Sequence, residues 1–319
     1  MAKTWIVVLA LLAVGCGSSE SEGPTKIRMG WGVPEEEVKY VLMKHPEVAP
    51  NLGKAYTIEW HQFAGTPLGV QGLAAGTLDC ATVGGLSVAN GLDKGADIVL
   101  LNELIEERKP NFTTPWMVRK DSGINSLEDL KGKTVATNAV GGSTDYFQDD
   151  YIERQTGLKA NVDYKKVEVP FGQMVETVLS GRADMGLFPQ PFYGQIDATG
   201  EVKTMFRLND GIEPFVQLLN GCRRGFVNDH KEAMRAFKRD WVRVTRWIAD
   251  PANRDQVVAA SAAATQIPAG VLDRFLLKDG DYYRPADGRI NVDALQREWD
   301  FFHDNGAFKR ELKVTEHVG

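Results

Sequence analysis

Two stretches of the sequence follow the same strand–turn–helix–strand plan. The first covers residues 58–83 and the second covers residues 164–188. In both, the helical run ends in a small residue, Gly, two further residues and Asp, which is Ala75 to Asp79 in the first and Ser180 to Asp184 in the second. A repeated βαβ unit predicts two similar α/β lobes in one chain. Two lobes enclose a cleft, and ligands bind preferentially in such clefts.

The N-terminus has the pattern of an export signal. Lys3 supplies a positive charge, and the apolar run over residues 5–14 is too short to span a bilayer. The sequence from Leu12 to Cys16 resembles a bacterial lipoprotein signal, which predicts cleavage after residues 1–15 and a lipid on Cys16. An ordinary signal peptide or a short anchor is the alternative. Residues 16–25 are rich in Ser, Glu and Gly and predict a flexible tether, so we expect a body anchored at the membrane in the periplasm or on the cell surface.

The charge balance argues against nucleic acid as a partner. The 319 residues carry a formal net charge of −6, with 37 basic and 43 acidic residues and no basic stripe. Nothing in this pattern would attract a phosphate backbone. The length left after a leader is enough for two domains, and we expect a monomer.

The cysteines and histidines do not form a metal-binding pattern. Cys80 and Cys222 are the cysteines beyond Cys16, and the five His are scattered. An exported chain permits a disulfide between Cys80 and Cys222, although two buried thiols are the simpler interpretation. No metal and no cofactor are expected.

The order of predicted elements divides the chain into two interleaved lobes. Strand and helix patterns alternate over residues 26–104, and a second α/β pattern covers residues 113–207. A strand over residues 215–222 is followed by helical patterns over 230–249, 254–263, 270–277 and 292–303. We therefore predict an α/β protein in which each lobe is a mainly parallel sheet flanked by helices. Lobe I comprises residues 26–112 and 218–319, lobe II comprises residues 113–217, and two crossings form a hinge.

Candidate ligand-binding residues follow from the carboxyl ends of the predicted strands, where α/β sheets bind ligands. Lobe I offers turns after three strands, and lobe II offers three more. The candidates are Trp31, Gly32, Phe63, Ala64, Gly65, Thr66, Gly85 and Ser87 in lobe I, and Trp116, Asn138, Gly141, Gly142, Ser143, Thr144, Phe171, Pro189 and Gln190 in and around lobe II.

These turns combine features that suit an anion. Gly65, Gly85 and Gly142 permit close approach of the backbone to a ligand. Each turn leads into a helix whose first N–H groups lack partners, and Thr66 is the expected N-cap of one of them. Taken singly, such turns are ordinary helix starts. Their position at the same sheet edge in both lobes favours a binding role.

Aromatic and charged residues narrow the class of ligand that we expect. Trp31 can stack on a ligand, whereas Trp116 fits the back wall of a cleft or the core. No strand-end turn contains Arg or Lys, the residues that usually hold a dicarboxylate or phosphate. We therefore expect a small organic ligand with at most one diffuse negative charge and an apolar or aromatic part. The acidic residues Glu35 to Glu37 are expected at an exposed helix start, where they could also meet basic loops of a permease.

The ordered set of motifs resembles the solute-binding proteins that serve ABC importers of aliphatic sulfonates, taurine, nitrate and the thiamine pyrimidine precursor. The resemblance covers residues 26–304. It is carried by the turn Phe63 to Thr66, the run Leu130 to Ala136, Gly141 to Thr144, and Pro189 to Tyr193. It implies a type II periplasmic binding fold, one ligand between the lobes, no catalysis, and ABC permease and ATPase subunits as partners.

Two other functions fit the same fold. One is an enzyme related to pyrimidine-precursor synthases, but those carry a cysteine-rich motif that this sequence lacks. The other is a sensor module that presents a ligand to a membrane receptor, and it would use the same binding residues.

Overall fold

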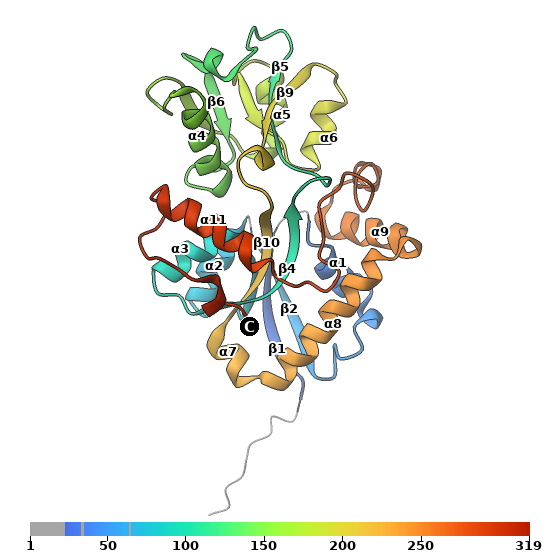
Figure 1. The fold of residues 1–319 in the computed structure, drawn as a ribbon. Helices are drawn as coiled ribbons and strands as arrows, with labels where there is room; N and C mark the ends of the chain where they lie inside the picture. The colour runs from blue at the N-terminus through green and yellow to red at the C-terminus, as the bar shows by residue number, and fades with distance from the viewer. Residues whose placement is uncertain (1–22, 33–34, 64) are drawn as a thin grey trace, which may run out of the picture.

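The computed structural model describes residues 23–32, 35–63 and 65–319, and its strands form two five-stranded mixed sheets (Figure 1). The sheet of lobe I has the strand order β2-β1-β3-β10-β4. Its strands are β1 (Thr25–Trp31), β2 (Tyr56–Gln62), β3 (Cys80–Val83), β4 (Ile98–Glu107) and β10 (Phe215–Arg223). β1 is parallel to β2 and β3, while β10 runs antiparallel between β3 and β4.

Lobe II repeats this plan. Its strands are β5 (Pro115–Arg119), β6 (Thr134–Thr137), β7 (Lys165–Glu168), β8 (Met185–Leu187) and β9 (Val202–Arg207), in the order β7-β6-β8-β5-β9. β6 is parallel to β7 and β8, and β5 runs antiparallel between β8 and β9. The predicted repeat is therefore confirmed as β2-α2-β3 in one sheet and β7-α5-β8 in the other.

The helices cover both faces of each sheet (Figure 1). They are α1 (Glu37–Lys44), α2 (Thr66–Ala74), α3 (Gly85–Asp93), α4 (Ser143–Thr156), α5 (Phe171–Leu179), α6 (Phe192–Asp197), α7 (Arg224–Asp229), α8 (Lys231–Ala249), α9 (Arg254–Thr265), α10 (Ala269–Leu272) and α11 (Val292–Asp304). Short 3-10 helices occupy Pro46–Val48, Leu127–Leu130, Leu208–Asp210, Pro251–Asn253 and Val314–Glu316. The long helix α8 shows why these segments are helical, because Phe237, Trp241, Val244 and Ile248 recur at a spacing of three to four and are all buried. No helix in the described ranges is long and apolar enough to cross a membrane.

Two chain crossings join the lobes. One runs from β4 to β5 and the other from β9 to β10, and the two lie side by side. The Leu208 N–H donates to the Thr114 carbonyl oxygen at 3.0 Å, and the Lys109 N–H donates to a Glu213 carboxylate oxygen at 2.9 Å. The crossings thus form one paired connection at which the lobes can pivot.

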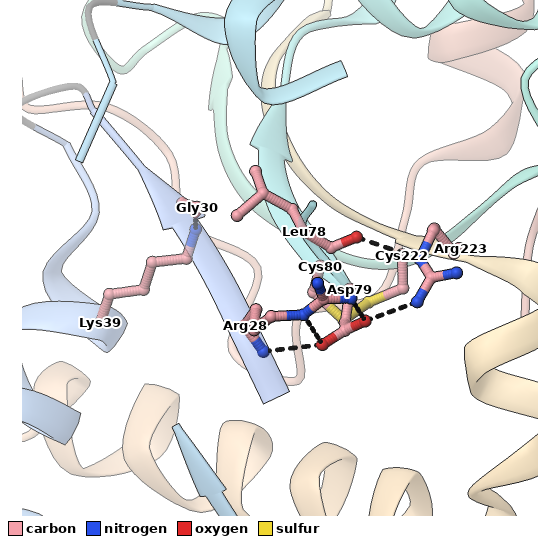
Figure 2. Close-up of a disulfide and its surroundings, with 8 residues drawn as sticks. All are labelled: Arg28, Gly30, Lys39, Leu78, Asp79, Cys80, Cys222 and Arg223. Carbon is pink, nitrogen blue, oxygen red and sulfur yellow. Dashed lines mark hydrogen bonds and ion pairs between the residues drawn. A yellow bond between two sulfur atoms is a disulfide. The ribbon is translucent and has the colours of Figure 1, made fainter. Parts of the chain in front are cut away.

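A disulfide joins Cys80 of β3 to Cys222 of β10 (Figure 2), which corrects the expectation of two buried thiols. The two residues face each other across the antiparallel pair, so their side chains are close enough to bond. Asp79 lies beside them and binds Arg28 and Arg223, each with a nitrogen–oxygen distance of 2.6 Å. Burial would raise the pKa of Asp79, but hydrogen bonds from these two guanidinium groups bring it below its usual value.

The start of α2 also differs from expectation. The structure places Gly65, with a φ of 138°, at the N-cap position, and Thr66 is the first helical residue. The Thr66 hydroxyl instead bonds the Ser87 hydroxyl of α3 at 2.9 Å. The two predicted hydroxyl groups of lobe I therefore bind each other rather than a free helix end.

Candidate functional site

A cavity of about 100 Å³ lies between the lobes, and we call it the interlobe cavity. Residues of both lobes and of the crossing from β4 to β5 line it. They are Glu35, Thr114, Thr144, Phe171, Leu187, Pro189, Gln190, Phe192, Gln217, Leu218 and Tyr282. A pocket of this composition, mostly apolar with a few polar groups, is typical of small-molecule sites.

Lobe II contributes the first turns of its helices. Thr144 lies in the first turn of α4, where its hydroxyl donates to the Asn138 side-chain oxygen at 2.7 Å. Phe171 begins α5 and stacks on Phe192 of α6, with ring centroids 5.7 Å apart. Gln190 precedes α6, and its backbone N–H donates to the Tyr282 hydroxyl of lobe I at 3.2 Å. The cavity is therefore closed on one side by a direct contact between the lobes.

A second, smaller pocket lies at the strand ends of lobe I, and we call it the strand-end pocket. It is lined by Gly30, Trp31, Gly32, Glu36, Phe63, Gly65, Thr66, Gly69 and Thr82. Gly32 is required here by the neighbouring strand, since a Cβ on it would lie 2.0 Å from the Phe63 carbonyl oxygen. Trp31 packs edge-on against Tyr40, with ring centroids 5.8 Å apart.

A buried ion pair forms the floor of the strand-end pocket. The Lys39 ammonium lies 2.9 Å from a Glu36 carboxylate oxygen, and both side chains are fully buried. The same ammonium donates to the Gly30 carbonyl oxygen at 2.9 Å and to the Thr82 hydroxyl. The other Glu36 oxygen accepts the Gly32 N–H at 2.9 Å. All three ammonium donors are thus used within the protein.

The expectation of exposed acidic residues at the start of α1 is wrong, because Glu35, Glu36 and Glu37 are all buried. Glu37 pairs with Arg284 at 3.0 Å. Glu35 is 9% exposed and lines the interlobe cavity, and burial raises its pKa well above the usual value, with a further increase from Glu37. These three carboxyl groups therefore lie inside the protein and not on its surface.

The predicted binding residues fall into three groups. Thr144, Phe171, Pro189 and Gln190 line the interlobe cavity, and five lobe I candidates, Trp31, Gly32, Phe63, Gly65 and Thr66, line the strand-end pocket. The candidates that line neither are Gly85, Ser87, Trp116, Asn138, Gly141, Gly142 and Ser143. Ala64 and Cys16 lie outside the described residues.

Trp116 and Gly85 are placed by packing instead. The Trp116 ring is fully buried in lobe II, stacks on Phe206 at 4.8 Å between centroids and donates its indole N–H to Gln148. The predicted role of Trp116 in the cleft is therefore corrected to core packing. Gly85 is buried beneath α11, where a Cβ would lie 2.8 Å from a Glu298 carboxylate oxygen. Its closest neighbour is thus a protein side chain, not a space for a ligand.

The sequence interpretation missed Glu35, Thr114, Leu187, Phe192, Gln217, Leu218 and Tyr282. The strand-end argument would have included Glu35 and Leu187 if it had been extended by a few residues along each strand or turn. Tyr282 lies in an irregular segment between α10 and α11, and no local pattern marks it as a site residue. Only the packing of the C-terminal segment against the crossings brings it to the cavity.

A comparison with protein families identifies the chain. The model of the family described as NMT1/THI5 like matches residues 62–253. The chain belongs to the NMT1/THI5-like family. This match spans most of the cavity residues of lobe II, and it agrees with the predicted resemblance.

Solved structures share the fold of this NMT1/THI5-like chain. The periplasmic aliphatic sulphonate-binding protein SsuA of Escherichia coli is 18% identical with a TM-score of 0.73, covering 93% of this chain and 92% of that one. SsuA of Xanthomonas axonopodis pv. citri, bound to MOPS, is 16% identical with a TM-score of 0.70, covering 94% and 99%. The periplasmic nitrate-binding protein NrtA of Synechocystis PCC 6803 is 13% identical with a TM-score of 0.69, covering 92% and 86%. The type II periplasmic binding fold is thereby confirmed.

Curated relatives match only a part of the chain. An ATP phosphoribosyltransferase of Nitratidesulfovibrio vulgaris is 33% identical over 95 residues, and the same enzyme of Desulfosudis oleivorans is 32% identical over 111 residues. The chain spans about a third of the length of these relatives, 29% of the first and 33% of the second. A match of this extent does not carry an activity across to this family member.

Proposed function

We propose that this protein is an extracytoplasmic solute-binding protein that captures one small organic ligand between its lobes and delivers it to an ABC importer. The observation that carries the proposal is the interlobe cavity, to which both lobes and the crossing from β4 to β5 contribute residues. It binds its ligand without converting it. The permease and ATPase subunits of the importer are the partners that the family resemblance implies.

Capture would work by shifting an equilibrium between open and closed lobes. Phe171 and Gln190 move with lobe II, whereas Glu35 and Tyr282 move with lobe I. A ligand that contacts both sets favours the closed form, because only that form makes all of the contacts at once. The closed form is then the one that docks on the permease.

The disulfide supports an extracytoplasmic location. Cys80 and Cys222 are bonded and fully buried. Such bonds persist in oxidising compartments and are rare in the cytosol.

The binding proposal predicts that Phe171→Ala weakens the capture of a ligand. Phe171 presents a partly exposed ring to the cavity, so its truncation removes apolar contact without opening the core. A thermal-shift screen over small anionic, neutral and cationic organic compounds should find one that raises the melting temperature, because a ligand of the folded state stabilises it. Calorimetry should then show about tenfold weaker binding to Phe171→Ala, a loss of about 1.4 kcal/mol.

Val162→Ala is the matched control, since Val162 is 79% exposed and does not line the cavity. If the parent and both variants bind the same compound with equal affinity, that compound binds outside the interlobe cavity. A screen in which no class of compound stabilises the protein would contradict the proposed function.

We also propose that the protein is anchored by a lipid on Cys16, which lies outside the described residues. Cys16→Ser removes the thiol that the lipid requires, so the variant should leave the membrane fraction after cell lysis. The measurement is immunoblotting of membrane and soluble fractions for the parent and the variant. Sedimentation of Cys16→Ser with membranes would exclude this mode of anchoring.

A further inference from the structure

Two buried oxygen atoms, on residues that line the interlobe cavity, lack hydrogen-bond partners among the described residues. They are Oε1 of Glu35 and Oε1 of Gln190, on side chains 9% and 6% exposed. Both residues line the cavity, one from each lobe. A buried acceptor without a partner costs about 1–3 kcal/mol, and more for a charged group. A ligand that donates hydrogen bonds to both atoms would recover that cost.

The donors that an anion would need are already used. Lys39 donates to Glu36, Gly30 and Thr82, and no Lys or Arg is among the described residues lining either pocket. Two N–H groups in the turns beside the pockets are also occupied. The Gly32 N–H donates to Glu36 at 2.9 Å, and the Gly141 N–H donates to Asp145 at 2.8 Å.

Acidic residues make the surroundings of Glu35 negative. Glu37 and Asp281 are both near it, and Arg284 is the guanidinium that opposes them. Arg284 bonds both of these acids, with its Nε 3.0 Å from Glu37 and its Nη1 2.7 Å from Asp281, while its Nη2 has no partner among the described residues. Three carboxyl groups thus share one guanidinium, which forms ion pairs with Glu37 and Asp281.

Given the proposed capture of a ligand in this cavity, on which this step rests, we propose that the ligand carries a protonated nitrogen, as an amine or amidinium, attached to an apolar group. The nitrogen binds the Glu35 carboxylate and the side-chain oxygen of Gln190. The apolar group packs against Phe171, Phe192 and Leu218. We expect sulfonates and nitrate to bind more weakly, because their oxygens cannot donate hydrogen bonds to these two side-chain oxygens.

The helix ends beside the cavity do not reverse the preference for a cationic ligand. α4 and α5 begin near it, and a helix N-terminus favours an anion by about 0.3–1 kcal/mol. Burial raises the pKa of Glu35 and so favours its neutral form in the free protein, and a cationic group would favour the ionised form. Such a charge-assisted contact is stronger than the attraction of a helix end.

A matched series of ligands tests the charge preference. Benzamidine, benzamide and benzenesulfonate share one ring and differ in the head group, which is cationic, neutral or anionic. Calorimetry on the full protein should show benzamidine binding at least about tenfold more tightly than the other two. Glu35→Gln should reduce benzamidine affinity at least about tenfold and change benzamide affinity little, because Gln keeps a polar group of the same size but not the charge. Glu201→Gln, on the exposed surface, is the control.

The pH dependence of binding to the wild-type protein tests the same charge preference without a variant. A cation binds the ionised form of Glu35, so benzamidine affinity should rise with pH over the range in which Glu35 loses its proton, and an anion would show the opposite trend. The titratable and charged groups facing Glu35 are Glu36, Glu37, Glu103, Asp281, Tyr282 and Arg284.

The outcomes separate this inference from the proposed function. Tightest binding of benzenesulfonate, retained in Glu35→Gln, would overturn the inference and leave capture in the cavity standing. Absence of benzamidine binding, with another compound from the wider screen bound in the cavity, would overturn it too. Only failure of every class of compound to bind would contradict the proposed function itself.

Discussion

Glu103 of β4 is a buried carboxyl whose ionisation is linked to folding. The residue is 2% exposed, and one of its oxygens accepts the Asn291 N–H at 2.8 Å. Burial, with a smaller contribution from Glu106, raises the pKa of Glu103 to about 8. The folded state therefore holds a proton on Glu103 at pH values where the unfolded chain has lost it.

This shift predicts that the free energy of unfolding decreases as the pH rises. The ordinary pKa of a glutamate is about 4.3, so the loss occurs between about pH 4 and pH 8, at up to about 1.4 kcal/mol per pH unit for this group. Glu103→Gln imitates the protonated form and should flatten the decrease, as measured by urea unfolding at several pH values. Glu201→Gln should leave it unchanged, and an equally steep decrease in Glu103→Gln would refute the assignment.

The sequence predicted a binding residue correctly where the end of a strand alone determines the position of that residue. Thr144, Phe171 and Gln190 reach the interlobe cavity because each lies in the connection or first helical turn that follows a strand of lobe II. Glu35 was misjudged as a solvated residue, because an acidic run at a helix start is normally exposed. Its burial depends on segments far away in sequence, such as the one that carries Tyr282 and Arg284, which no local pattern reveals.

At the scale of elements, the bond between β3 and β10 closes a long loop. Cys80 and Cys222 are separated by 142 residues, and all five strands of lobe II lie between them. Cross-linking such a loop removes conformational entropy from the unfolded chain, worth at most about 5 kcal/mol in the loop-entropy model. The bond also fastens β10, which leads out of the hinge, to the centre of the lobe I sheet.

The double variant Cys80→Ser/Cys222→Ser should therefore lose about 2–5 kcal/mol of unfolding free energy. Denaturant unfolding with and without dithiothreitol measures it. The reductant should destabilise the parent by a similar amount and leave the double variant unaffected. Identical midpoints for the parent and the double variant would show that the bond does not stabilise the fold.

Most elements were predictable because their patterns are local. The helices α8, α9 and α11 begin within one residue of their predicted starts, since their apolar spacing is a local signal. The antiparallel insertion of β10 was not predicted, because strand order is set by the path of the chain between lobes. The disulfide follows from that order, which places Cys222 opposite Cys80.

At the scale of the whole molecule, the two sheets and two crossings enclose a cavity that neither lobe forms alone. Its apolar lining and its unpartnered oxygens come from different parts of the chain, and they meet only when the lobes approach each other. The Gln190–Tyr282 hydrogen bond marks this approach. Binding of the ligand and closure of the lobes are therefore coupled.

The most direct test is a crystal structure of the protein with the compound that most raises its melting temperature. The account predicts ligand density between the lobes, in contact with Phe171 and Thr144 on one side and with Glu35 and Tyr282 on the other. Density confined to another site, such as the pocket of lobe I lined by Val38, Leu104 and Ile248, would contradict capture between the lobes.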